Sequence, residues 1–283
     1  MSALSQIRKI NKRMPTLLPG IILLLILVIP PTLGRPFLDL ELTQISSSRI
    51  NIPPGAEYPL GTQSEGRDML TILILGTGAT LKIGLIAGAI GLAVGAILGM
   101  ISGYFGGFID KTISAIVDSF ITIPPLAILI LIAAATKTMS IEGMGIIVAL
   151  TAWMQPTRII RSQMLSMKER NYIRLAKLSD MGSIKIIFTE ILPNLIPFLA
   201  AAFVNGVSTA ILSSIGLEVL GLGSQQTLSL GMTIYYANYY SAMWRGIWWW
   251  WLPPVIVIVL IFIALFLISL SLDEIGNPKF NRL

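Results

Sequence analysis

The sequence contains no cysteine and no histidine. Their absence excludes disulfide bonds, zinc sites built from cysteine and histidine, and catalysis by a histidine base. Charged residues are also scarce, because Asp, Glu, Lys and Arg make up only 12% of the 283 residues, whereas hydrophobic residues make up 54%. A soluble domain of this size needs far less apolar surface, so the composition predicts a membrane protein that crosses the bilayer several times.

Long apolar runs account for most of the chain. A bilayer core of about 30 Å is crossed by about 20 apolar residues in a helix. Because the runs are long and almost free of charge, they favour helices, which satisfy their own backbone hydrogen bonds. We therefore predict an all-α, polytopic membrane protein with about six transmembrane helices. The candidate spans are residues 17–33, 83–101, 113–135, 143–160, 195–214 and 252–270.

The basic residues are distributed unevenly between the two sides of these spans. With the N-terminus inside the cell, 14 of the 20 Lys and Arg residues fall on the cytoplasmic side and 6 on the outer side, which predicts that both termini are cytoplasmic. No basic patch with interleaved aromatics indicates nucleic-acid binding. The expected order is a cytoplasmic segment (1–16), a first transmembrane helix (17–33), an extracytoplasmic loop and interfacial segment (34–78), a transmembrane core (79–273) that includes a cytoplasmic loop (161–193), and a cytoplasmic tail (274–283).

The cytoplasmic loop is the most charged part of the chain. Its basic residues Arg170, Arg174 and Lys177 share one face of a helix, because they are four and three residues apart. A turn at residues 180–182 separates this helix from a second, amphipathic one that ends at Pro193. The loop either only sets the topology or inserts a helix into a groove of a cytoplasmic protein. The other face of the first helix carries Tyr172, Leu175, Ala176 and Ser179, and the apolar stripe of the second carries Ile184, Ile187, Phe188 and Ile191.

Residues 172–194 begin Tyr-Ile-Arg-Leu-Ala-Lys-Leu-Ser-Asp-Met-Gly and end Ile-Leu-Pro-Asn. Without a gap, this segment resembles the cytoplasmic signature of binding-protein-dependent ABC importer permeases, which is Glu-Ala-Ala, three residues, Gly and later Ile-Leu-Pro. Ala176 matches the second Ala of that signature. Arg174 stands at its Glu, Leu175 at its first Ala and Asp180 at its Gly, with Gly182 two residues later.

Other motifs extend the resemblance from about residue 58 to 280. Together they are most similar to the C-type permease of the dipeptide, oligopeptide and nickel group. These motifs are Tyr58-Pro-Leu-Gly-Thr62, Glu65-Gly-Arg-Asp68, Gly103-Tyr-Phe-Gly-Gly107 with Asp110, Val117-Asp-Ser-Phe120, Ile123-Pro124, Leu220-Gly-Leu-Gly223, the tryptophans 248–251, and Leu272-Asp273 with Asn277-Pro278.

The resemblance implies the ABC importer permease fold in the plasma membrane of a prokaryote. It implies four kinds of partner: a second homologous permease subunit, two ATPase subunits, an extracytoplasmic solute-binding protein and the lipid bilayer. The chain itself would be no enzyme and would hold no cofactor or metal, with ATP and Mg²⁺ on the ATPase subunits. The implied cargo is oligopeptides, with oligosaccharides as the alternative. The residues implied in coupling to the ATPases are Tyr172, Ile173, Arg174, Leu175, Ala176, Lys177, Ser179, Asp180 and Gly182.

Taken alone, the residues leave other functions open. An ion-coupled secondary transporter or channel would use acids inside its spans, and Asp118 and Glu218 are the nearest candidates, each either a relay or an interhelical contact. A membrane scaffold would carry no solute. No Gly-x4-Gly-Lys-Ser/Thr phosphate loop occurs in the sequence, so ATP hydrolysis would take place on another chain.

Tyrosines and tryptophans between residues 235 and 251 indicate an interfacial anchor or a docking surface. The substrate path is not assigned.

Overall fold

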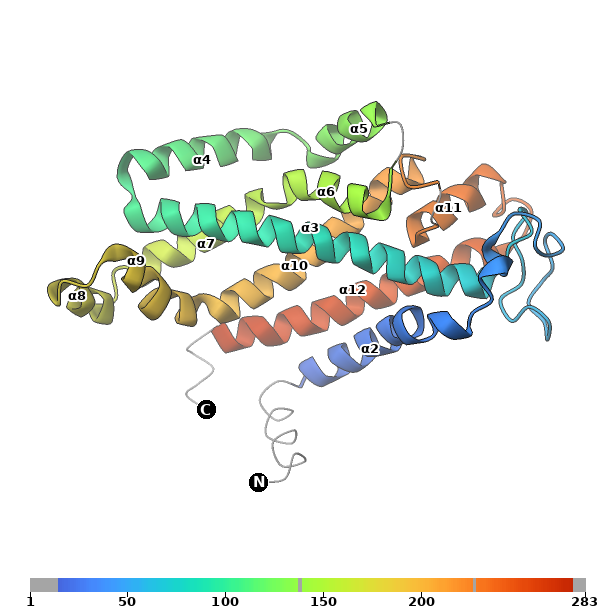
Figure 1. The fold of residues 1–283 in the computed structure, drawn as a ribbon, viewed down its shortest axis with the longest axis horizontal. Coiled ribbons are helices and arrows are strands. Elements are labelled where there is room, and N and C mark those ends of the chain that lie inside the picture. Colours follow the sequence, from blue (N-terminus) through green and yellow to red (C-terminus); the bar gives the residue numbers. More distant parts are fainter. Residues whose placement is uncertain (1–14, 137–138, 226–227, 277–283) are drawn as a thin grey trace, which may run out of the picture.

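Helix α3 (Met69–Phe105) runs through the middle of the computed structural model, which describes residues 15–136, 139–225 and 228–276 (Figure 1). The helix begins where the Asp68 carboxylate accepts a hydrogen bond of 2.8 Å from the Thr71 amide. It ends at Gly106, whose φ of 67° lies in the left-handed region that favours glycine. Since α3 starts at Met69, the last part of the predicted 34–78 segment belongs to this helix.

Helices surround α3 on both sides, and within the described ranges the only β-type pairing is an isolated bridge between Thr62 and Asp68. This confirms the predicted all-α class. The remaining α-helices are α2 (Leu17–Leu33), α4 (Gly107–Thr122), α5 (Pro125–Ala135), α6 (Ile141–Ala152), α7 (Met154–Met167), α8 (Asn171–Leu178), α9 (Ser183–Ile186), α10 (Leu192–Val219), α11 (Leu230–Tyr239) and α12 (Trp248–Gly276); the shorter turns are the 3-10 helices η1 (Arg35–Phe37) and η2 (Leu40–Thr43) and the π-helical turn η3 (Ile187–Ile191).

A stripe of glycines on α3 allows α6 and α7 to approach its backbone. A β-carbon at Gly91, Gly95 or Gly99 would lie 2.7 to 2.8 Å from atoms of α6 or α7, too close for any side chain without movement. Nearer the start of α3, Gly84 faces Ile211 of α10 in the same way. Small residues at this spacing are the usual means by which membrane helices pack, because dispersion contacts replace the hydrophobic effect inside a bilayer.

The predicted spans correspond to helices, but two of them are interrupted. Three helices of the described chain are long and apolar enough to cross a membrane, and a fourth is obtained if α4 and α5 count as one span bent by 78°. The bend lies at Ile123, whose extended backbone (ψ 128°) is the conformation that a following proline, here Pro124, imposes. The fourth predicted span breaks at Trp153, because Pro156 has no amide hydrogen for the Ala152 carbonyl. α2 and α6 are shorter apolar helices.

The two ends of the bundle differ in structure. At one end, α8 and α9 project beyond the long helices, and the start of α2 and the end of α12 point the same way (Figure 1). At the opposite end lie α11 and the loop that precedes α3. The predicted cytoplasmic loop, the start of α2 and the end of α12 are therefore on one side of the bundle.

The loop before α3 is irregular, as expected, but its last residues are fixed in place. The Trp249 indole donates a hydrogen bond of 3.1 Å to the Thr62 carbonyl, and the Thr62 hydroxyl donates one of 2.6 Å to the Arg49 carbonyl. Trp250 is completely buried and stacks on Tyr240, with ring centroids 5.6 Å apart. These aromatics therefore pack inside the protein, whereas Trp244, 90% exposed, remains available to a membrane interface or a partner.

Candidate functional site

The short helix α8 is the centre of the predicted cytoplasmic site, and its end is defined by Asp180. The Met181 amide bonds the Ala176 carbonyl at 3.2 Å and the Asp180 amide bonds the Lys177 carbonyl at 3.1 Å, which together form a Schellman motif. Asp180 has a φ of 56°, in the left-handed region. Glycine adopts this conformation most easily, and aspartate is among the few other residues that tolerate it. The predicted break after the first helix is confirmed, since α9 starts at Ser183.

The inner face of α8 packs against its own chain. Ile173 is fully buried and Ala176 nearly so, in a cluster with Ile160 and Met164 of α7 and Ile191 of η3. This cluster continues to α3 through Ala96. Two of the nine predicted coupling residues therefore hold α8 in place and have no surface to offer a partner. Helical spacing did not reveal this, because it cannot tell which apolar face points inward.

The outer side of the same segment exposes large apolar side chains. Leu175 is 64% exposed and Leu178 is 83% exposed, on one face of α8 because they are three residues apart. Beyond the turn, Ile184 and Phe188 are also exposed. Single exposed apolar residues are ordinary, but several large ones on one projecting element mark a surface for a partner.

The turn η3 explains why the second helix does not bury a single apolar stripe. Its backbone bonds reach five residues back, so the register of the side chains shifts within residues Ile187–Ile191. Ile187 and Ile191 are buried, whereas Ile184 and Phe188 are exposed. The one-sided stripe predicted from the sequence is therefore wrong, and half of it is available at the surface.

The charged side chains of α8 lie on the solvent side. Arg174 donates a hydrogen bond of 3.3 Å to Glu169, and both side chains are about two-thirds exposed. The Lys177 ammonium lies 5.7 Å from the centre of the Tyr104 ring at the end of α3, a cation–π geometry. Exposed pairs of this kind contribute little to stability. Arg174 and Lys177 can therefore exchange these contacts for contacts with a partner at a small cost in free energy. The remaining predicted residues, Ser179, Asp180 and Gly182, are exposed and Tyr172 is partly buried.

An ionic cluster connects this end of the bundle to α4. Arg161 of α7 forms two bonds to the Asp110 carboxylate, from Nε and, at 2.7 Å, from Nη2. The Ser102 hydroxyl of α3 donates to the same carboxylate. One turn closer to the start of α7, Arg158 lies 3.7 Å from Asp118 of α4. The sequence alone did not assign a role to Asp110 or Arg161. Asp110 precedes one apolar run and Arg161 follows the next, and these opposite charges could have indicated an ion pair.

Glu218 occupies a different place from the one expected. It lies within α10 and is fully buried, whereas the sequence puts it just beyond the fifth span. A β-carbon at Gly231 would lie 2.3 Å from the Glu218 Oε2 atom, so glycine there leaves room for the carboxyl group. Gly231 is in the first turn of α11, so the Glu218 side chain lies against the start of that helix.

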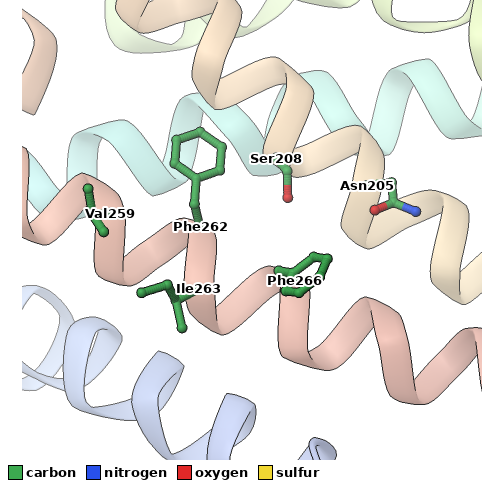
Figure 2. A pocket seen from close by; sticks show the side chains of 6 residues that line it. All are labelled: Asn205, Ser208, Val259, Phe262, Ile263 and Phe266. Carbon is green, nitrogen blue, oxygen red and sulfur yellow. The ribbon is translucent and has the colours of Figure 1, made fainter.

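A cavity of about 470 Å³ opens between α10 and α12 (Figure 2). Asn205 and Ser208 contribute polar groups from α10, and α12 contributes an apolar wall that includes Phe262 and Phe266. Ser269 of α12 donates a hydrogen bond of 3.0 Å to Asn205 Oδ1. An exposed amide in the middle of a spanning helix is costly against lipid, so we expect this face to contact protein or water.

Across the described ranges, no three Asp or Glu side chains come together as a metal site would require. The arrangement as a whole is a projecting helix with an exposed apolar face, connected through a buried cluster and ion pairs to the long helices. Such an arrangement can transmit movement between a soluble partner and the membrane core.

Comparisons with known proteins agree with this geometry. The family model described as binding-protein-dependent transport system inner membrane component matches residues 95–282. The chain is 29% identical over 208 residues to the oligopeptide transport system permease protein OppC of Mycobacterium tuberculosis, covering 73% of this chain and 70% of the relative. It is 30% identical over 208 residues to a putative peptide transport system permease protein of Brucella suis, covering 72% and 69% of the two chains.

A solved structure shares the fold. A chain of the MetNI methionine ABC transporter, in an inward-facing conformation, superposes with a TM-score of 0.59 and 21% sequence identity, covering 74% of this chain and 96% of that chain. At this identity the likeness concerns the fold alone.

Proposed function

Because the chain belongs to the family of binding-protein-dependent transport system inner membrane components, we propose that it forms, with a second permease subunit, the path by which an ATP-driven importer carries oligopeptides across the cell membrane. The observation that carries this proposal is the family match, which spans residues 95–282 and so includes the whole cytoplasmic segment around α8. Oligopeptides are the proposed cargo because similar permeases are named for oligopeptide or dipeptide transport.

Coupling to the ATPases is assigned to α8. Its exposed residues Leu175 and Leu178 would enter a groove of an ATPase subunit, while Ile173 holds the helix on its own chain. An amphipathic helix of this kind binds a groove through its apolar anchors, and the charged rim adjusts affinity. Arg174 and Lys177 would form that rim.

Movement of α8 would reach the membrane core by two routes. The first is the buried cluster that joins Ile173 to α7 and η3. The second is the ion pair of Arg161 with Asp110, which joins α7 to α4. Packed helices move as rigid bodies between discrete arrangements, so closure of the ATPases would open the path to one side of the membrane and then to the other.

The remaining partners follow from the family. ATP and Mg²⁺ would bind to two separate ATPase subunits, since the sequence contains no phosphate-binding loop. An extracytoplasmic solute-binding protein would deliver the cargo to the end of the bundle where α11 lies. Both chain termini would be cytoplasmic, on the side of α8, in the plasma membrane of a prokaryote.

Reconstituted transport tests the proposal. The permease pair and its ATPases are placed in proteoliposomes with ATP inside, and the cognate solute-binding protein is added outside with a labelled oligopeptide or oligosaccharide. We expect peptide uptake that requires ATP and is inhibited by vanadate. Uptake of the oligosaccharide but not of the peptide would show that the cargo is an oligosaccharide. Uptake driven by an ion gradient without ATP would contradict the importer mechanism.

A further inference from the structure

We propose that a cavity between α2, α3 and the start of α6 binds one glycerophospholipid of the outer leaflet, with the phosphodiester group at Arg35 and Lys82. The cavity measures about 610 Å³ and is separate from the one between α10 and α12. This proposal concerns the bilayer and does not depend on which solute the protein carries.

Polar and apolar groups are separated along the length of the cavity. Arg35, which follows the end of α2, lines the cavity together with Lys82 and Glu142. Lys82 donates a hydrogen bond to Glu142, which lies in the first turn of α6. Toward the middle of the long helices the lining is apolar, with Leu24 of α2 and Leu265 of α12. A phospholipid has the same order of groups, a charged head at the interface and hydrocarbon beneath it.

The charges at the mouth suit a phosphate. Lys82 forms an ion pair with Glu142, but both side chains are slightly more than half exposed, so the ammonium retains N–H groups for a second acceptor. Arg35 is exposed and, within the described part of the chain, forms no ion pair. The mouth of the cavity carries two cations and one carboxylate, so its net charge is positive. A positive mouth attracts an anionic or phosphodiester headgroup.

The position of α2 favours lipid over transported solute. α2 lies at the edge of the bundle (Figure 1), and Ile22, Ile26 and Leu33 expose large parts of their side chains on its surface. An exposed apolar surface of this kind suits contact with acyl chains, so the hydrocarbon of the lipid would lie along α2. A path for a peptide would instead be enclosed by protein.

The test measures lipid retained by the intact permease complex. Complexes are purified from nanodiscs that contain phosphatidylethanolamine and phosphatidylglycerol, and bound phospholipid is counted by native mass spectrometry during stepwise delipidation. The test variant carries Arg35→Gln and Lys82→Met. Arg49→Gln removes an exposed outer cation that does not line the cavity. Glu142→Gln breaks the same ion pair as Lys82→Met but keeps both cations.

We expect one phospholipid per chain to be retained by the wild type, Arg49→Gln and Glu142→Gln proteins. In the double variant retention should weaken roughly twenty-five-fold, because each of the two cations near the headgroup contributes about fivefold. Equal retention by the double variant and the wild type would overturn the proposal. An equal loss of phospholipid from the Glu142→Gln protein would also overturn it, because the ion pair between Lys82 and Glu142 would then act only on the fold. Displacement of the lipid by tetra-alanine would assign the cavity to the solute instead.

Discussion

At the scale of single residues, Asp180 shows how a departure from a family pattern can be read physically. The pattern has Gly where this chain has Asp180, and the backbone there is left-handed, with a φ of 56°. The requirement is therefore conformational, and aspartate meets it at some cost in free energy. Gly182 has an ordinary φ and open space around it, so it does not supply the missing glycine.

Substitution at Asp180 should follow this conformational requirement. Asp180→Gly should preserve or raise the stability of the segment, whereas Asp180→Val should lower it by about 1 kcal/mol or more, since a β-branched residue is strained at positive φ. The midpoint of thermal unfolding of the purified permease complex measures this. Gly182→Ala is the control and should change nothing. An Asp180→Val protein as stable as the wild type would contradict the assignment.

Leu175 should matter for partner binding and not for folding. Because it is 64% exposed, Leu175→Asp removes no buried contact, but it would place an unpaired charge in an ATPase groove. We expect association with the ATPase to weaken about thirtyfold, equivalent to about 2 kcal/mol at an interface anchor. Surface-immobilised ATPase measures the affinity, and ATP-driven uptake should fall with it.

Two other positions on α8 complete this test. Asn171→Asp adds the same charge to the exposed start of α8, where a negative group is favoured, and should leave binding unchanged. Ile173→Ala should instead lower the stability of the permease itself by about 2 to 4 kcal/mol, because Ile173 is fully buried. Unaltered ATPase binding in the Leu175→Asp protein would remove α8 as the coupling element.

At the scale of elements, the contact between α4 and α7 is ionic where most other helix contacts are apolar. Asp110 receives bonds from Arg161 and Ser102, so three helices meet at one carboxylate. Val117 is the one residue of α4 that is buried. With so little apolar burial, α4 depends on these charged bonds for its position beside α7.

Breaking this pair should affect coupling as well as stability. Arg161→Ala leaves the Asp110 carboxylate without its main partner and should cost about 2 kcal/mol of stability, since both side chains are only partly exposed. If the pair transmits movement, the ratio of peptide transported to ATP hydrolysed should also fall. The exchange Asp110→Arg with Arg161→Asp should recover part of both quantities. An unchanged ratio in Arg161→Ala, at matched abundance, would limit the pair to a structural role.

At the scale of the whole molecule, the fold places α8, the start of α2 and the end of α12 on one side and α11 on the other (Figure 1). The excess of Lys and Arg on the side of α8 predicts that this side is cytoplasmic. The arrangement of the helices puts α8 opposite α11, and the charge asymmetry predicts which of these two sides faces the cytoplasm.

Cysteine labelling in intact cells tests this orientation without interference, because the natural chain has no cysteine. We expect an impermeant thiol reagent to label Ser47→Cys directly, and to label Ser2→Cys and Ser179→Cys only after the membrane is permeabilised. Ser47 and Ser179 are both exposed, so access to the side chain does not limit the reaction. Labelling of Ser179→Cys in intact cells would reverse the topology.

The sequence by itself determined the features that depend on neighbours along the chain. Hydrophobic runs fixed the membrane class and the approximate spans, because crossing a bilayer requires a minimum apolar length. Charge asymmetry predicted the orientation, and the pattern around Ala176 located the short helix α8 and its end at Asp180. The break between α4 and α5 is also a local effect, since Pro124 restricts the residue before it.

Only the tertiary structure decided which surfaces of those elements are available. Periodicity gave α8 two faces, but packing against α7 and η3 determined that Ile173 is buried and Leu175 exposed. The pairing of Asp110 with Arg161, 51 residues apart, and the cavity beside Lys82 also depend on how distant helices are placed. Such contacts are set by the global fit of the helices, which no local pattern specifies.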